Sequence, residues 1–312
     1  MNGRRIQSLS FGLVATLLTT GLLSVTPARA DLRIVATIPD LAAVAKAVGG
    51  DNVTVEALAS ASEDPHYVDP RPSFLPRLAR ADVLIAVGLQ LEIGWLPPLL
   101  INARNSAIQV GGAGYIDAST FVSYKLQVFT MQIDRSMGDV HPGGNPHFHN
   151  APAPMIEVAR GLGERFASLD AKHAAAYRAR ARAFAAQLQA VADKTSTRLA
   201  KLPASKRRVV VFHDSFRYLI QWLGLEQVTT IEERPGIRPS PARVAAVMGT
   251  MRAMAARVII QEVWHLDGVS RMLAQKAPGK LVKITGGVTT LTGEAYLAYL
   301  ESLASEIIDA LQ

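Results

Sequence analysis

The sequence predicts an α/β protein with two parallel-sheet lobes joined by one long, rigid helix. Short runs rich in β-branched residues alternate with amphipathic helical stretches, which is the pattern of βα units around parallel sheets. No glycine or proline occurs between Ala171 and Leu199, and a helix of about 30 residues spans roughly 45 Å. That length exceeds one small domain, and the chain beyond residue 30 has the size at which one core divides into two.

The elements are expected in the following order. Strands are predicted at residues 32–36, 53–58, 82–87 and 107–110 in the first half, and at 208–212, 228–231, 257–260 and 281–284 in the second. Helices are predicted at residues 39–48, 171–199 and 292–311. Asp170 is a suitable N-cap for the long helix, and Pro203 ends it. The stretch 111–153 is rich in Gly, Pro and Asn and is expected to be a long functional loop region.

These elements divide the chain into four parts. We expect a signal peptide at residues 1–30, a first α/β lobe at 31–150, linking helices at 151–206 and a second α/β lobe at 207–312.

The first 30 residues have the features of a secretory signal peptide. Arg4 and Arg5 precede an uncharged apolar run, and the segment closes on Ala28-Arg29-Ala30, a small-x-small cleavage pattern. The run is shorter than the roughly 20 residues that a spanning helix needs, although a retained anchor is the alternative. Because the chain has no cysteine to carry a lipid or form a disulfide, we expect a periplasmic protein that is soluble after signal-peptide removal.

The net charge argues against a nucleic-acid partner. The chain carries +7, and removing the three arginines of the signal segment, which has no acidic residue, leaves +4. The remaining basic residues are scattered with few aromatic residues among them, as on a solvated helix face.

Four of the seven histidines lie where a parallel α/β fold places its binding residues. His213 directly follows the fifth strand, and open α/β sheets bind ligands outside the carboxyl ends of their strands. His66 lies in the loop after the second strand, and His147 and His149 lie in the long loop region. Imidazole is a preferred ligand of zinc and similar divalent metals. A metal site is therefore the first hypothesis.

Glu262 completes the predicted site because it follows the strand at 257–260, on the same sheet edge as His213. Three imidazoles and one carboxylate fill a tetrahedral shell and leave no position for a reacting water, as a binding protein requires. Taken singly, each histidine is more simply a loop residue, and the Pro-His pairs at 65–66 and 146–147 can be turns. Their joint placement favours a site. His173, on the long helix, is expected on the solvated face.

Five segments in order match motifs of one protein family. They are residues 64–73 (Asp-Pro-His-Tyr-Val-Asp-Pro-Arg-Pro-Ser), 88–96 (Gly-Leu-Gln-Leu-Glu-Ile-Gly-Trp-Leu), 145–147 (Asn-Pro-His), 212–218 (Phe-His-Asp-Ser-Phe-Arg-Tyr) followed by Leu-Gly-Leu at 223–225, and 232–241 (Glu-Glu-Arg-Pro-Gly-Ile-Arg-Pro-Ser-Pro). Over the whole chain beyond the signal segment, the sequence resembles the extracytoplasmic solute-binding components of ABC importers for zinc and manganese.

The resemblance implies two α/β lobes joined by a rigid helix, with the metal between the lobes. It implies that His66, His147 and His213 are metal ligands. Members with histidine at the third position mostly bind zinc, whereas manganese binders tend to have glutamate there. The implied transported ion is therefore Zn²⁺, with Mn²⁺ less favoured.

Two features depart from the family pattern. The usual fourth ligand, an aspartate after the last strand, has no counterpart, because residues 283–288 read Lys-Ile-Thr-Gly-Gly-Val. Glu262 is the first choice for the fourth ligand, and the other candidates are His149, Glu63, His141, His265 and a water. The family's long histidine-rich loop is also missing, and only the short stretch 141–149 stands in its place.

The sequence thus favours a monomeric periplasmic binding protein, not an enzyme, that delivers zinc to the permease of an ABC transporter. The alternative is a zinc-dependent hydrolase in which three histidines hold an activated water, but no HExxH-like arrangement supplies a general base. A surface adhesin is a third, weaker hypothesis because the chain has no lipid anchor. Gly111-Gly112-Ala113-Gly114 lacks the lysine of a phosphate loop, and Ser215 lies outside a Gly-x-Ser-x-Gly elbow.

Overall fold

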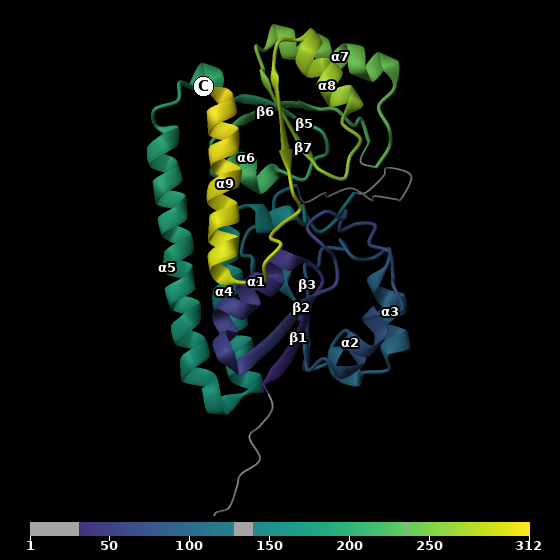
Figure 1. Ribbon diagram of the computed structural model, residues 1–312, viewed down its shortest axis with the longest axis vertical. Coiled ribbons are helices and arrows are strands. Elements are labelled where there is room, and N and C mark those ends of the chain that lie inside the picture. Colours follow the sequence, from purple (N-terminus) through teal and green to yellow (C-terminus); the bar gives the residue numbers. More distant parts are fainter. Residues whose placement is uncertain (1–30, 128–139, 235) are drawn as a thin grey trace, which may run out of the picture. The chain divides into compact units, whose positions relative to one another are not determined.

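Two parallel sheets organise the chain (Figure 1). The computed structural model describes residues 31–127, 140–234 and 236–312, and within them each sheet has four strands. The first sheet has the order β2-β1-β3-β4 and the second the order β6-β5-β7-β8. The strands are β1 (Leu32–Ala36), β2 (Val53–Ala57), β3 (Val83–Ala86), β4 (Tyr115–Asp117), β5 (Arg208–Val211), β6 (Glu226–Thr230), β7 (Val258–Glu262) and β8 (Lys280–Ile284). The predicted fold class is confirmed.

Both sheets have the same connectivity, although the sequence shows no repeat. In each, the second strand lies on one side of the first, and the third and fourth lie on the other. Every neighbouring pair is parallel. The central strands β3 and β7 are buried along their whole length, as expected for parallel strands covered on both faces.

The prediction of a strand at residues 107–110 is wrong. Ser106–Ile108 instead form a short 3₁₀ helix, because the Asn105 side chain accepts a hydrogen bond from the amide of Ala107 at 3.1 Å. Val110 is 77% exposed, whereas Ile108 is fully buried in the core cluster that contains Leu84 and Ala86 of β3. The fourth strand lies eight residues further on, after the glycines, at Tyr115–Asp117.

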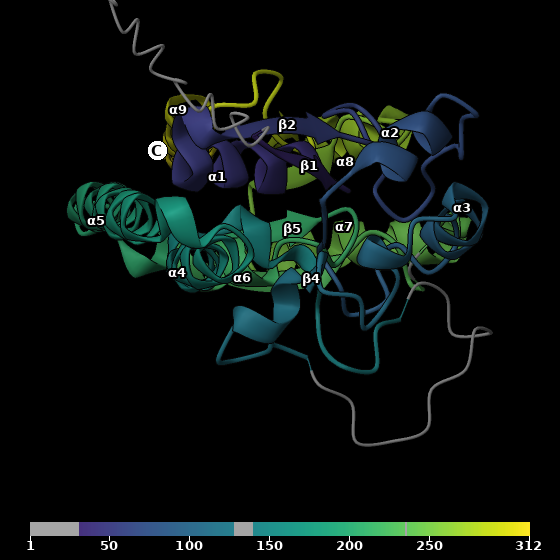
Figure 2. The same cartoon turned by 90° about the horizontal axis from the view of Figure 1, so that it is seen from below.

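The long helix is present as α5 (Ala174–Leu199), which packs along α4 (Pro152–Leu169) (Figure 2). The predicted N-cap role of Asp170 is wrong. A 3₁₀ turn, Ala171–His173, precedes α5, and the Asp170 carboxylate accepts hydrogen bonds from the Tyr177 hydroxyl and His173 Nδ1 instead of capping an amide. This pairing also leaves His173 only partly exposed.

The helix α9 (Gly293–Leu311) lies beside α5 and connects the cores of the two sheets (Figure 1). Its first half, with Tyr296 and Leu300, packs in the core of the first sheet, and Leu303 and Ile307 pack in the core of the second. Thr292 caps it by accepting from the amide of Ala295 at 3.2 Å. The final helix therefore joins both halves, as α5 was predicted to do.

The other helices connect strands within each sheet. They are α1 (Pro39–Gly49), α2 (Phe74–Arg80), α3 (Leu96–Ala103), α6 (Arg217–Trp222), α7 (Pro241–Ala253) and α8 (Gly268–Lys276). None of the helices described is long and apolar enough to span a bilayer. Asp31–Gln312 form a single compact unit, and the domain boundaries at 150 and 206 stay predictions. The predicted signal peptide lies outside the described residues.

Candidate metal centre

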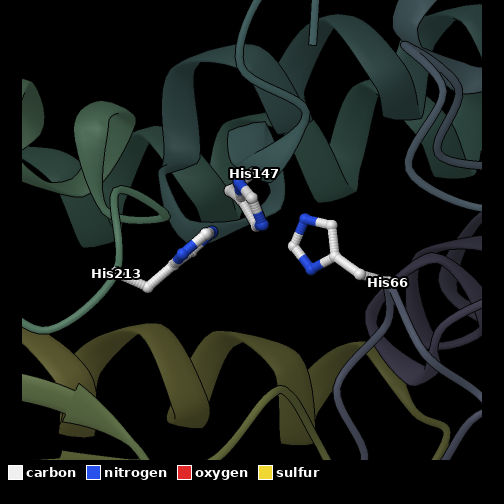
Figure 3. A group of neighbouring side chains, drawn as sticks. All are labelled: His66, His147 and His213. Carbon is white, nitrogen blue, oxygen red and sulfur yellow. The ribbon is translucent and has the colours of Figure 1, made fainter. Parts of the chain in front are cut away.

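Three of the predicted ligands, His66, His147 and His213, meet at one point (Figure 3). One ring nitrogen of each lies within 4.8 Å of the others, and this is the one such group of histidine and carboxylate ligands among the described residues. The side chains are 9%, 4% and 7% exposed. They come from the loop after β2, the 3₁₀ helix at His147–Asn150 and the residue two beyond β5.

His66 is oriented by Asp64, two residues before it. One oxygen of the Asp64 carboxylate accepts hydrogen bonds from the His66 amide at 3.0 Å and from His66 Nδ1 at 2.8 Å. Trp95 fixes the same turn, since its Nε1 donates to the carbonyl of Pro65 at 2.9 Å. Because a carboxylate can only accept, Nδ1 carries the proton, and the Nε2 lone pair faces the other histidines.

His147 is held by Asn145 in the same way. Asn145 Oδ1 accepts from the His147 amide and from His147 Nδ1, each at 3.0 Å. The amide group of Asn145 donates to the carbonyl of Asp214 at 2.7 Å and to Gln127 Oε1 at 2.8 Å. The second ligand is thereby tied to the chain segment that carries the third.

His213 hydrogen-bonds through Nδ1 to Glu232 Oε2 at 2.9 Å, and both side chains are buried. Burial lowers the pKa of His213, but the bond to Glu232 and the charges of Glu262 and Asp64 outweigh it and raise the pKa to about 9. Burial lowers the pKa of His147 well below its usual value, and the neighbouring His66 and His213 lower it further. Without metal, protonation is thus favoured on His213 over His147.

The arrangement suits a divalent cation. In each of the three rings a side-chain oxygen engages Nδ1 and leaves Nε2 for the centre, which is the usual outer-shell pattern of metal-bound histidines. The carboxylates of Asp64 and Glu232 behind two of the rings balance the charge of a dication. A cavity of about 260 Å³, lined in part by His147, His213 and Glu232, opens onto the cluster.

Glu262, the predicted fourth ligand, lies at the end of β7 outside the group of three. One of its oxygens accepts a hydrogen bond from the Ser215 hydroxyl, and the other lies 3.5 Å from His265 Nε2. Burial raises the pKa of Glu262 to about 7, against the opposing effects of His213 and Ser215. Its role as a ligand stays a prediction.

The other fourth-ligand candidates are spread around the cluster. Glu63 pairs with Arg71 at 2.9 Å, and the ring of His265 stacks on Phe212 with centroids 4.4 Å apart. His149 Nδ1 bonds the buried Asp40 carboxylate at 2.9 Å, and its ring faces His147 at 6.2 Å. A cavity of about 10 Å³, near the size of one water, adjoins both His149 and Glu262.

His141 contacts the cluster directly. Its Nε2 is 3.2 Å from His66 Nε2, and its Nδ1 bonds the carbonyl of Leu89 at 2.9 Å. Burial and the neighbouring His66 lower the pKa of His141 to about 4. At neutral pH this ring is uncharged, and its Nε2 lies against Nε2 of His66.

Sequence reasoning missed two acidic residues that organise the site. Glu232 was noted only within a family motif, although it lies just after β6, a position that signals ligand-edge residues. Asp40 lies in the first turn of α1, and its fully buried carboxylate accepts from His149 and from the amide of Val288. Asp40 therefore joins α1 to the loop after β8, where the family's aspartate is missing.

The fold and the histidine cluster define a class, that of two-sheet proteins which hold a divalent metal between the sheets. A family model confirms it: residues 34–310 match ZnuA, the periplasmic component A of the zinc-uptake complex. The chain belongs to this family of metal-binding components of ABC importers. It is thus an extracytoplasmic binding protein, not an enzyme, and the hydrolase alternative is set aside.

Curated relatives and solved structures agree with this assignment. The chain is 27% identical to the high-affinity zinc uptake system protein ZnuA of Paracoccus denitrificans, over 83% of this chain and 84% of that one. It is 23% identical to the manganese ABC transporter substrate-binding lipoprotein PsaA of Streptococcus pneumoniae, over 71% and 68%. A crystal structure of ZnuA superposes with a TM-score of 0.72 at 23% identity, covering 90% of this chain and 100% of that one. The FpvC protein of Pseudomonas aeruginosa in complex with Mn²⁺ gives 0.73 at 23% identity, over 90% and 98%.

Proposed function

We propose that this protein binds Zn²⁺ with high affinity in the periplasm and delivers it to the permease of an ABC transporter. The observation that carries the proposal is the buried group of His66, His147 and His213, each with its Nδ1 engaged by a side-chain oxygen. Neutral imidazoles suit zinc, whereas manganese favours carboxylate, carbonyl and water oxygens. The supporting relatives are named for zinc, manganese and iron, so the choice of zinc rests on the ligands of this chain.

In this proposal the metal displaces a proton. His213 bonds Glu232 through Nδ1, so its Nε2 holds the second proton in the metal-free protein and releases it to the solvent when the ion binds. Asp64, Asn145 and Glu232 keep the three rings in place during this exchange. The sequence predicts Glu262, a buried carboxylate near His213, as the fourth ligand. The experiments below therefore include a Glu262 variant.

The location is proposed from the sequence. Residues 1–30 have the pattern of a cleaved signal peptide, and the chain contains no cysteine to which a lipid could be attached. PsaA, by contrast, is named as a lipoprotein. We expect the protein in a periplasmic extract to begin at Asp31. N-terminal sequencing checks this.

The decisive experiment is metal competition on the purified chain from Asp31 onward. Zinc affinity is measured against a chromophoric chelator, and manganese is then titrated into the zinc-free protein. We expect zinc to bind at one equivalent and far more tightly than manganese. Equal affinity for the two ions, or no binding of zinc, contradicts the proposal.

A further inference from the structure

We propose that His141 is the fourth metal ligand, so that four imidazoles surround the ion. This inference rests on the proposed function and names a residue that the family pattern does not provide. It starts from the 3.2 Å separation of His141 Nε2 and His66 Nε2. In a tetrahedral zinc site with Zn–N bonds of about 2.0–2.1 Å, two ligand nitrogens lie about 3.3–3.4 Å apart. The two rings already have the spacing of neighbouring ligands.

The His141 ring is oriented as the other three are. Its Nδ1 hydrogen-bonds a backbone carbonyl, that of Leu89, which accepts and so places the proton on Nδ1 and the lone pair on Nε2. The residue also begins a tight turn through Pro142 and Gly143, closed by the amide of Gly144 donating to the carbonyl of His141 at 3.1 Å. Gly144 has φ of 120°, which favours glycine.

The acceptor for His141 lies in an unusual backbone segment. Gly88, Leu89 and Gln90 have φ values of 87°, 53° and 66°, a run that leucine and glutamine seldom adopt. The buried Glu92 carboxylate stabilises the run by accepting from the amides of Val87 and Gly88. Strained backbone of this kind concentrates at functional sites. Here it points the Leu89 carbonyl at His141.

The competing candidates each make one contact away from the cluster, although His149 Nε2 and one Glu262 oxygen have no hydrogen-bond partner among the described residues. One oxygen of the Glu262 carboxylate accepts from Ser215, and the other, which has no hydrogen-bond partner in the described part of the chain, lies 3.5 Å from Nε2 of His265, whose ring is stacked on Phe212. His149 is bonded to Asp40, and its ring contacts His147 alone among the three clustered histidines. Among the candidates, His141 has a nitrogen that lies 3.2 Å from a ligand nitrogen of the cluster.

One adjustment is needed on binding. His141 is not within the group whose nitrogens are mutually within 4.8 Å, and its ring centroid is 5.3 Å from that of His66 but 6.3 Å from that of His147. The ion therefore draws the 141–144 turn toward His147 and His213. Four nitrogen ligands would further separate zinc from manganese.

The test exploits the absence of cysteine from the chain. A cysteine that binds cobalt produces a thiolate-to-cobalt charge-transfer band, so a single introduced cysteine reports whether its position is a ligand. The variants are His141→Cys, His66→Cys as the positive control and His173→Cys as the negative control, each loaded with Co²⁺. Zinc affinities of His141→Ala and Glu262→Gln are measured in parallel.

We expect the band in His141→Cys and His66→Cys, and none in His173→Cys. We expect His141→Ala to weaken zinc binding at least about tenfold, by analogy with the 10–100-fold effects of lost outer-shell partners. We expect Glu262→Gln not to weaken it. A band in His66→Cys alone, or parental affinity in His141→Ala, overturns the inference but leaves the proposed function standing. A parent that binds neither zinc nor cobalt overturns the proposed function itself. If His141→Cys takes up no cobalt, the zinc affinity of His141→Ala decides whether His141 is a ligand.

Discussion

Replacing Glu232 with glutamine should abolish most of the pH dependence of zinc binding. The Glu232 carboxylate bonds His213 Nδ1 at 2.9 Å and is a main reason that the pKa of His213 rises to about 9. An amide has the same shape but no charge. The pKa of His213 should therefore fall toward, or below, the usual value of about 6.5.

The magnitude follows from proton competition. With a pKa of about 9, His213 is about 99% protonated at pH 7 in the metal-free protein, which lowers apparent zinc affinity about 100-fold, or about 2.7 kcal/mol. Apparent zinc affinity should therefore rise as His213 loses its proton, about tenfold per pH unit between pH 7 and 9. In Glu232→Gln this competition is nearly absent, but the weaker, less well oriented ligand lowers intrinsic affinity about 10–100-fold. At pH 7 the two effects on apparent zinc affinity oppose each other. At pH 9 proton competition is small in both proteins, so the loss of intrinsic affinity in Glu232→Gln is seen by itself.

The assay is a zinc competition titration of both proteins from pH 6.5 to 9. Calorimetry in buffers of different ionisation enthalpy supplies the number of protons released. The parent should release about one proton from His213 per zinc near pH 7.5, and Glu232→Gln much less. Glu233→Gln is the matched control, because Glu233 is adjacent but exposed. A parent whose affinity is flat above pH 7, or a variant with the parental slope, refutes the reasoning.

Three further outcomes are expected. Alanine at any one of the clustered histidines, His66, His147 or His213, should lower zinc affinity by tens-fold or more in the same titration, and His173→Ala should not change it. Saturating zinc should raise the melting temperature by several degrees, because a hundredfold excess over Kd adds about 2.7 kcal/mol to a protein that binds only when folded; an unchanged melting curve contradicts a specific site. Asp40→Asn should lower the free energy of unfolding by about 1–3 kcal/mol in urea, because it disrupts buried hydrogen bonds to His149 and Val288. The cobalt spectrum of that variant should stay parental, and a changed spectrum would make Asp40 part of the metal site.

Much of the fold was predictable because its signals are local. β1 and β5 are rich in buried β-branched residues, and they lie at 32–36 and 208–211, where strands were predicted at 32–36 and 208–212. The misplaced fourth strand shows the limit. Residues 107–110 include Ala, Ile and Val, but Asn105 caps a 3₁₀ turn there. Whether a short run joins a sheet depends on a neighbouring strand that local pattern does not reveal.

The sequence by itself determined which residue types could bind a metal and which three histidines lie at strand ends or in loops. It could not determine how those loops meet, because that depends on two separate sheets packed along α5 and α9. The same holds for the carboxylates. Glu232 and Asp40 contact histidines 19 and 109 positions away in the chain. Only the tertiary structure decided that Nε2 of His141 lies 3.2 Å from Nε2 of His66, because separations of a few ångströms between distant segments are decided by packing.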